Sequence, residues 1–305
     1  MPAIVIRDLT KHYGDIRAVD GISLEIADRE IFGILGPNGA GKTTTLEMIE
    51  TLREPDSGEI LVAGKSVGSE PRAVKEVLGV QLQNTVFFDN LTVGETIDLF
   101  GGFYRRAVPT DELLETVELS EKKGAMLDEL SGGQQKRVSI ALALVNDPDI
   151  VFLDEPTTGL DPQARRNIWD IVEKLRGRDK TVVITTHYIE EAEHLCDRVA
   201  VMDHGRIISL GTPNELIDAN APESGISFRM RPPLTEEQVH AVTGVLTVSV
   251  QNGDEYHVTT VTPQDTLAGI FQAAYENGAV ADEITMRRAT LEDVFLKITG
   301  RSLRE

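Results

Sequence analysis

Residues 36–43 place the strongest constraint on this chain, because they read Gly-Pro-Asn-Gly-Ala-Gly-Lys-Thr and follow directly on the apolar run 31–35. They fit the pattern G-x-x-x-x-G-K-[ST], in which backbone N–H groups surround the phosphate groups of a nucleotide. In that pattern the lysine contacts the terminal phosphates and the next hydroxyl group binds Mg²⁺. The sequence therefore predicts a strand, a phosphate-binding loop and a helix beginning at Lys42, rather than an ordinary glycine-rich turn with a surface lysine.

A second glycine-rich turn lies at residues 130–137, which read Leu-Ser-Gly-Gly-Gln-Gln-Lys-Arg and lead into the apolar run 138–145. The first turn of a helix has unpaired N–H groups and the positive end of the helix dipole, which together bind phosphate oxygens. Most serine- and glycine-rich segments are simple turns. The helix that follows this one favours a second phosphate-binding site.

Two carboxylates, Asp154 and Glu155, follow the apolar run 150–153. An unbroken apolar run is typical of a strand buried on both faces, and side chains at the end of such a strand face the ligand crevice of an α/β sheet. We expect Asp154 to orient Mg²⁺, through water, and Glu155 to polarise the attacking water as general base. In isolation such a pair is more often a solvated helix start.

His187 ends the next apolar run along the chain, residues 181–185 followed by Thr186. A lone histidine is usually structural. Here the strand comes directly after the one that ends in Asp154, so we expect the two strand ends to lie side by side. The sequence therefore predicts that His187 lies next to Asp154 and Glu155.

These motifs, in this order, resemble the ATP-binding cassette (ABC) family, the ATPase halves of ABC transporters. Residues 156–161 match the loop that follows the catalytic glutamate of that family. The resemblance covers essentially the whole chain; it is strong to about residue 215 and weaker through the tail. It implies ATP and Mg²⁺ as cofactors, with Glu155, His187 and Lys42 as the catalytic residues.

The resemblance also assigns residues whose role their own chemistry does not reveal. Tyr13 stands where the family has an aromatic side chain that stacks on adenine, although buried packing is an alternative for this ring. Gln83 matches the glutamine that contacts Mg²⁺; Gln81, two residues away on the same side of an extended chain, is the alternative, and the spacing favours Gln83. The implied metal ligands are Thr43, Gln83 and Asp154.

Both glycine-rich segments contribute to the implied nucleotide site. Its residues are Tyr13, Gly36, Pro37, Asn38, Gly39, Ala40, Gly41, Lys42, Thr43, Thr44, Gln83, Ser131, Gly132, Gly133, Gln134 and Asp161. The serine turn cannot close on the phosphate loop of its own chain if a helical insertion separates them. The family solves this with a head-to-tail homodimer, in which Ser131 and Gly133 cap ATP held by the other subunit and Asp161 lies at the interface.

The order of expected elements predicts two domains, which is also the default for 305 residues. Residues 1–219 alternate strands and helices as in an α/β P-loop NTPase: we expect strands at 22–26 and 31–35, helices from 42 to about 52 and at 189–195, and a hairpin turn at 203–206. A helical subdomain is inserted at about 84–145, with helices at 92–104 and 111–119. A composition break at 220–225 predicts a linker. Residues 220–305 follow the order strand, helix, strand, strand, helix, strand of a small α+β, ferredoxin-like domain, with the first strand expected at 226–230, and Asn-Gly at 252–253 predicts a hairpin within it.

Charge and hydropathy limit the partners and the location. The formal net charge of −20 repels nucleic-acid phosphates and anionic lipid headgroups, so we expect no nucleic-acid partner and no direct membrane insertion. No apolar run is long enough to span a bilayer, no signal-peptide segment is visible, and the single cysteine excludes an internal disulfide. We expect a cytoplasmic protein held at the inner face of the cell membrane by a permease subunit. The acid excess with few lysines is typical both of a high-salt cytoplasm and of ordinary acidic proteins.

The C-terminal segment 289–301 resembles the tail of ATPase subunits from ABC-2-type exporters, which include the daunorubicin-type drug-resistance systems. The tail implies export of a drug, lipid or polysaccharide. Together with the cassette motifs, the resemblance implies an ATPase subunit that dimerises around two ATP molecules and drives this export by a separate transmembrane permease. In the family, the region of Phe87 and Phe88 accepts a cytoplasmic helix of the membrane subunit; a role in the subdomain core is equally consistent. The alternative function is a soluble ABC ATPase of DNA repair or translation, which the single cassette, the one cysteine and the net charge disfavour.

Overall fold

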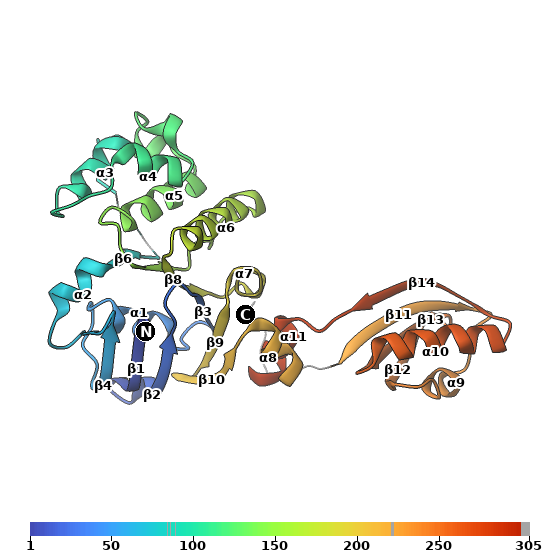
Figure 1. The fold of residues 1–305 in the computed structure, drawn as a ribbon. Coiled ribbons are helices and arrows are strands. Elements are labelled where there is room, and N and C mark those ends of the chain that lie inside the picture. The colour runs from blue at the N-terminus through green and yellow to red at the C-terminus, as the bar shows by residue number, and fades with distance from the viewer. Residues whose placement is uncertain (84, 86, 89, 221–222, 300–305) are drawn as a thin grey trace. The chain divides into compact units, whose positions relative to one another are not determined.

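The phosphate loop lies on a mixed sheet whose strands follow the spatial order β10-β9-β3-β8-β7-β6 (Figure 1). The computed structural model describes residues 1–83, 85, 87–88, 90–220 and 223–299. The strands of this sheet are β3 (Ile31–Leu35), β6 (Leu78–Gln81), β7 (Ile150–Asp154), β8 (Thr181–Thr186), β9 (Arg198–Asp203) and β10 (Arg206–Gly211). All are parallel except β10, which returns antiparallel to β9.

The predicted apolar runs form the central strands because both faces of this sheet are covered. Every residue of β3, β7 and β8 is buried, as expected for parallel strands packed between layers. The covering helices include α1 (Lys42–Ile49), α5 (Gly132–Ala143), α6 (Pro162–Gly177) and α7 (Ile189–Leu195). Helix α1 begins at Lys42 as predicted but ends before the expected Leu52, because Thr51 has a φ of 62° that no helix accommodates.

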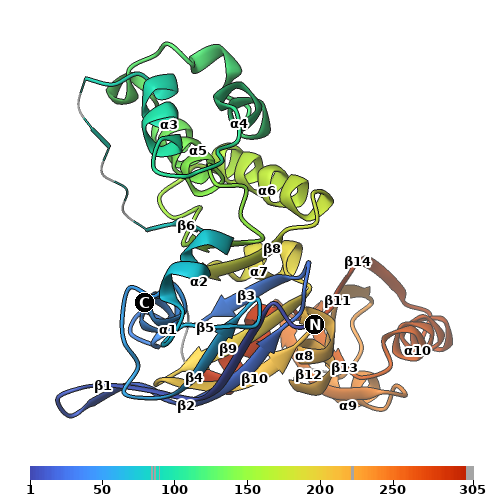
Figure 2. The same cartoon turned by 60° about the vertical axis from the view of Figure 1, so that its left-hand side comes forward.

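A second, antiparallel sheet packs on the same core (Figure 2). Its strands, in spatial order, are β2 (Ile16–Ile26), β1 (Ile4–Tyr13), β4 (Ser57–Val62) and β5 (Lys65–Ser66), and α2 (Pro71–Val77) follows them. The strand expected at 22–26 begins six residues earlier, since the first half of β2 pairs with the end of β1 although it is largely exposed. Strand pairing, not burial, extends this strand.

The described part of the segment between β6 and β7 contains several helices. They are α3 (Val93–Gly101), α4 (Thr110–Thr116), the short 3₁₀ turns Ser120–Lys122 and Leu127–Glu129, and α5. Thr92 and Glu95 form a reciprocal capping box that starts α3. Helix α4 is shorter than the expected 111–119, because Glu118 has a φ of 58°.

The described residues divide into two compact units, residues 1–213 and those from Asn214 on. The second unit begins with α8 (Pro213–Asn220) and contains β11 (Ser224–Arg231), α9 (Glu236–His240), β12 (Val245–Gln251), β13 (Glu255–Thr260), α10 (Pro263–Glu276), β14 (Val280–Arg287) and α11 (Leu291–Thr299). Its antiparallel sheet has the order β12-β13-β11-β14, and α9 and α10 pack on one face around Phe228 and Tyr256.

The predicted hairpin is confirmed, since β12 pairs with β13 and both Asn252 (φ 54°) and Gly253 (φ 83°) adopt the left-handed conformation of its turn. The linker expected at 220–225 is only partly described, because residues 221–222 lie outside the described part. Ser224 and Gly225 belong to β11, so that strand begins before the expected residue 226. Among the described helices, none combines the length and the apolar character that crossing a bilayer requires.

Glu50 closes α1 inside the core of residues 1–213, where only 4% of its surface is exposed. Burial raises the pKa of its carboxyl group from 4.5 to about 8, with smaller contributions from the negative charges of Asp154 and Glu47. Between these two pH values the folded protein keeps a proton that the unfolded chain releases. Glu50 therefore lowers the free energy of unfolding as pH rises through this interval.

Replacing Glu50 with glutamine should remove this pH dependence. We expect Glu50→Gln to be more stable than the wild type at about pH 8, by up to a few kcal/mol since one pKa unit corresponds to about 1.4 kcal/mol, and to match it at about pH 5. Thermal and urea unfolding across this range measures the difference. Glu59→Gln, at an exposed ion pair with Arg7, is the control and should show no such trend; a Glu50→Gln variant without extra stability at the higher pH contradicts the prediction.

Candidate active site

The loop between β3 and α1 takes a shape that only glycine allows. Gly39 and Gly41 have φ values of 81° and 103°, and a Cβ atom on Gly41 would lie 2.2 Å from the carbonyl oxygen of Ala18. A Cβ atom on Gly36 would lie 2.3 Å from the carbonyl oxygen of Met202. Gly41 immediately precedes α1 and has no side chain to cap it, so the N–H groups of the first helical turn are available to an anion.

Lys42 is held across this loop. Its ammonium group donates to the carbonyl oxygens of Gly36 at 2.8 Å and Pro37 at 3.1 Å, and its side chain is largely buried. Burial lowers the pKa of Lys42, while the negative charges of Glu155 and Asp154 oppose that shift. The cation therefore lies where a phosphate group at the loop would compete with carbonyl oxygens for it.

The predicted carboxylates lie at the end of β7, next to β8. Asp154 accepts a hydrogen bond from the hydroxyl group of Thr185; burial raises the pKa of Asp154, and this bond opposes the rise. The N–H group of Glu155 donates to Thr185 Oγ1 at 3.0 Å and to Thr185 O at 3.2 Å. Glu155 has a φ of 45°, a strained conformation for a residue with a side chain, and such strain is concentrated at functional sites.

Three side chains converge on Oε2 of Glu155. Gln83 Nε2 lies at 3.1 Å, Thr158 Oγ1 at 3.1 Å and His187 Nδ1 at 3.5 Å. The structure thus brings Gln83 and His187 to the carboxylate from distant parts of the sequence. Thr158 was missed as an individual residue; its only signal was its place in the segment 156–161.

Gln83 and Gln81, the two candidates for the glutamine that contacts Mg²⁺, line different clefts. Gln83 lines the cleft above the phosphate loop together with Glu155. Gln81 is 1% exposed and lines a separate, mainly apolar cleft of about 480 Å³ with Glu50, Phe100 and others. The geometry therefore favours Gln83 as the residue that acts at the carboxylates.

The cleft above the loop has a volume of about 920 Å³. Residues expected from the sequence that line it are Tyr13, Asn38, Gly39, Gly41, Lys42, Thr43, Thr44, Gln83 and Glu155. Tyr13 is 40% exposed, so the alternative of buried packing is wrong for this ring. A cleft of this size, with cationic and hydroxyl groups at its floor and an aromatic ring at its edge, suits a nucleotide.

The rim of this cleft contains residues that the sequence did not identify as part of a site: Asp15, Ile16, Arg17, Ala18, Asp20, His204 and Arg206. The turn at Gly205 joins the phosphate loop because its N–H group donates to Ala40 O and its carbonyl oxygen accepts from Asp20 N, both at 2.9 Å. Arg206 binds Asp20 at 2.7 Å and lowers the pKa of that carboxyl group. The sequence predicted this turn only as a hairpin, since nothing in it revealed the contact with the loop.

The serine turn does not reach this cleft. Ser131, Gly132, Gly133 and Gln134 are absent from its described lining. Ser131 caps α5 instead: its Oγ accepts from Gln134 N at 3.3 Å, and Gln134 Oε1 accepts from Ser131 N at 3.0 Å. A Cβ atom on Gly132 would meet open space, whereas one on Gly133 would lie 2.9 Å from Ala164 Cβ. The Ser131 turn is therefore exposed and lies outside the cleft above the phosphate loop of its own chain.

Asp161 is the N-cap of α6. One of its carboxylate oxygens accepts hydrogen bonds from the N–H groups of Gln163 and Ala164, both at 2.9 Å. This contact alone explains an aspartate at the position. Its side chain is also exposed, so it remains available at a subunit surface.

Magnesium fits the residues at the end of β7. Among the described residues, no three or more His, Cys, Asp or Glu side chains form a metal-binding group. Mg²⁺ does not need one, because it is usually bound by one or two protein groups together with phosphate oxygens and water. Thr43 lines the cleft, Gln83 contacts Glu155 there, and Asp154 is the buried carboxylate beside them, a donor set of this kind.

Comparison with known proteins identifies the family. The family described as "ABC transporter" matches residues 19–158. The daunorubicin resistance ATP-binding protein DrrA3 of Streptomyces coeruleorubidus is 38% identical and aligns with 98% of this chain and 96% of its own length. The chain therefore belongs to the ABC transporter ATP-binding proteins, a family of ATPases that bind ATP with Mg²⁺.

Further relatives agree with this assignment. The Nod factor export ATP-binding protein I of Burkholderia orbicola (strain AU 1054) is 39% identical over 99% of this chain and 98% of its own length. The structure of cbiO1 from Clostridium perfringens, part of the ABC transporter complex cbiONQ, superposes with a TM-score of 0.64 at 30% identity and covers 72% of this chain and 96% of that one. A dimeric post-hydrolysis structure of the ATP-binding cassette MJ0796 with ADP and Pi has a TM-score of 0.63 at 30% identity, over 68% of this chain and 98% of that one. The predicted family and its α/β cassette fold are confirmed, and DNA repair or translation finds no support.

Gln83 and Gln81 offer a matched pair of variants. We expect Gln83→Ala to lower kcat for ATP hydrolysis about tenfold, because Glu155 loses a hydrogen-bond donor that helps to hold it. Gln81→Ala should keep kcat within about twofold, since its amide lies in the other cleft. Steady-state phosphate release measures kcat, and thermal unfolding verifies that both variants are folded. The reverse ranking would assign the role to Gln81.

Proposed function

We propose that this chain is the ATP-hydrolysing subunit of an ABC exporter, which forms a homodimer around two ATP molecules and drives transport by a separate transmembrane permease. One observation supports the proposed homodimer. The cleft contains Lys42 and Glu155, whereas the Ser131 turn, the family's second phosphate-binding element, lies outside it. Only a second subunit can then bring such a turn to the nucleotide.

The relatives support the exporter. Their names describe daunorubicin resistance and Nod factor export, and each aligns with nearly the whole of this chain. The related cassette MJ0796 is dimeric in its post-hydrolysis state with ADP and Pi. A drug, lipid or polysaccharide is the class of cargo that this likeness favours. On this proposal the subunit is cytoplasmic and reaches the inner face of the cell membrane through the permease.

The chain's own residues account for the chemistry of hydrolysis. When bound, Mg²⁺ neutralises charge on the phosphate oxygens. We propose that Lys42 holds the terminal phosphates and that Oε2 of Glu155 accepts the proton of the attacking water. Gln83, Thr158 and His187 fix the position of that oxygen. The strained backbone of Glu155, held by Thr185, aims the carboxylate into the cleft.

Binding at a shared site also explains how ATP performs work. A ligand changes a conformational equilibrium only through its different affinity for the two states. Changing the ratio of two conformational states from 1:99 to 99:1 requires a difference in binding free energy of about 5.5 kcal/mol. Two shared sites with charge-assisted contacts from Lys42 and N–H contacts from the Ser131 turn are sufficient for a difference of this order. Hydrolysis removes the γ-phosphate and so reopens the dimer.

The finer domain assignments are also proposals. We propose an inserted helical subdomain at about 84–145, supported by α3, α4 and α5, which contact one another. We propose a boundary near residues 219–220, supported by the separate core of the second unit. The spatial order β14-β11-β13-β12, with α9 and α10 on one face, supports a ferredoxin-like assignment for that unit.

Phe88 is the described side chain that best suits contact with the permease. It is 56% exposed, although its ring lies 6.4 Å from that of Phe100. Phe103 and Tyr104 nearby are also exposed. A buried core residue would not leave this much apolar surface in water, so the exposure of Phe88 supports the docking interpretation for this side chain, whereas Phe87 is partly buried.

Glu155→Gln tests the dimer directly. We expect this variant to bind ATP, to form a stable dimer with ATP and to lose almost all turnover, because the amide cannot accept a proton from water. Size-exclusion chromatography with light scattering measures the dimer, and phosphate release measures turnover. A variant that stays monomeric with ATP and still hydrolyses it would contradict the proposal.

Lys42→Ala is the complementary variant. Removing the ammonium group should weaken equilibrium binding of ATP by at least about tenfold, since a charge-assisted contact to phosphate is lost. The variant should therefore form no dimer at ATP concentrations that saturate Glu155→Gln. Unchanged ATP affinity would show that Lys42 does not contact the phosphates.

A further inference from the structure

Lys136 lies on α5 and contacts the active site, although the proposed mechanism of hydrolysis does not use it. Its ammonium group donates to the carbonyl oxygen of Gln83 at 3.1 Å. Gln83 in turn donates to Glu155 Oε2 at 3.1 Å. Two hydrogen bonds, one to the main chain of Gln83 and one from its side chain, thus connect Lys136 of α5 to the carboxylate of Glu155.

The charge of Lys136 acts on the same carboxylates. Burial lowers the pKa of Lys136, and the negative charges of Asp154, Glu155 and Glu191 oppose that shift. A lysine is therefore retained in a partly desolvated position where its positive charge reduces the repulsion between Asp154 and Glu155.

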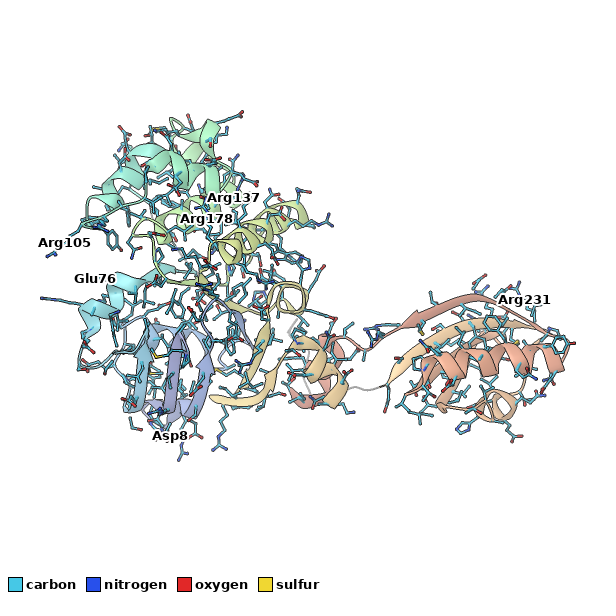
Figure 3. All side chains as sticks on the ribbon, viewed as in Figure 1. Asp8, Glu76, Arg105, Arg137, Arg178 and Arg231 are labelled. Atoms are coloured by element: carbon cyan, nitrogen blue, oxygen red, sulfur yellow. The ribbon has the colours of Figure 1, made fainter. Side chains whose placement is uncertain are left out.

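The neighbouring residue Arg137 makes its hydrogen bonds elsewhere, so the contact with Gln83 is particular to Lys136. Arg137, labelled in Figure 3, donates to the carbonyl oxygens of Val117 at 3.2 Å and Glu118 at 3.1 Å, within the helical segment. Two successive cations on α5 therefore serve different regions. Arg137 stabilises the helices, and Lys136 reaches the active site.

Helix α5 also begins at the Ser131 turn. Ser131 is its N-cap, and Lys136 follows five residues later on the same uninterrupted helix, about 7 to 8 Å along its axis. A rigid helix transmits a displacement of its first turn to Lys136. Helix α5 and Gln83 alone are therefore sufficient to connect the Ser131 turn to Glu155.

We propose that Lys136 is a positioning residue for ATP hydrolysis, which holds Gln83 at the active site of its own chain and links that site to the Ser131 turn on the same helix. The link between sites rests on the proposed function, in which Ser131 contacts the nucleotide of the other subunit. Engagement of that nucleotide then sets the position of Gln83 and Glu155 in the chain that supplies the turn. The two sites of the dimer thereby influence each other.

The local part of the proposal is tested by Lys136→Gln and Lys136→Arg. We expect Lys136→Gln to lower kcat about tenfold while KM for ATP stays within about threefold, because the hydrogen bond from a charged group is lost but the phosphate contacts remain. Lys136→Arg, which keeps the charge and the donors, should recover most of kcat. Lys123→Gln, at an exposed lysine paired with Asp111 at 2.6 Å, is the control and should leave kcat unchanged.

Thermal unfolding of each variant separates positioning from stability. A Lys136→Gln variant with wild-type kcat overturns the proposal. So does a loss of kcat that arginine does not restore and that parallels a fall in melting temperature, since that result indicates a structural role only.

The link between sites is tested by a double-mutant cycle with Ser131→Ala. If Lys136 transmits the engagement of the turn, the effects of Ser131→Ala and Lys136→Gln on kcat should be clearly less than additive. Additive effects overturn the link, and Ser131→Ala with Lys123→Gln provides the additive reference. If Glu155→Gln fails to dimerise with ATP, the proposed dimer fails, whereas a loss of kcat in Lys136→Gln that arginine restores still supports the contact with Gln83.

Discussion

The contact between the ends of β7 and β8 is the interaction on which the rest of the site depends. Thr185 donates a hydrogen bond from its hydroxyl group to Asp154, while its Oγ1 and carbonyl oxygen both accept from the N–H group of Glu155. A single residue of β8 therefore fixes one carboxylate and the strained backbone of the other. Parallel pairing of two fully buried strands makes this possible, because it aligns their carboxyl ends at one edge of the sheet.

Several charged side chains lie close to this contact, where they are partly shielded from solvent. Lys42 approaches the carboxylates from the phosphate loop and Lys136 from α5, and burial lowers the pKa of both lysines while the carboxylates oppose the shift. A low local dielectric strengthens each of these interactions and also makes an unpaired charge costly. The same packing that stabilises the sheet thus prepares a site for a polyanionic ligand and its cation.

Much of the fold could be predicted from the sequence, for identifiable reasons. Apolar runs ending in Asp154 and Thr186 form buried strands since both faces of the sheet are covered, and the helix at 189–195 is confirmed. Element ends were less accurate, because single residues with positive φ, such as Thr51 and Glu118, stop helices whose side-chain pattern continues. The place of Arg206 at the rim gave no signal, since it arises from contacts between distant segments, and Thr158 was marked only by its place in the segment 156–161.

The sequence by itself determined the phosphate loop, the two strand-end carboxylates and the ABC family, because these depend on local spacing and on residue types that the chemistry requires. Only the tertiary structure decided that Gln83 rather than Gln81 meets Glu155, that Tyr13 is exposed at the cleft, and that the cation of Lys136 reaches the active site. The physical reason is the same in each case. Which side chain reaches a given atom depends on the packing and direction of elements far apart in the chain, and a pattern of residue types does not contain that information.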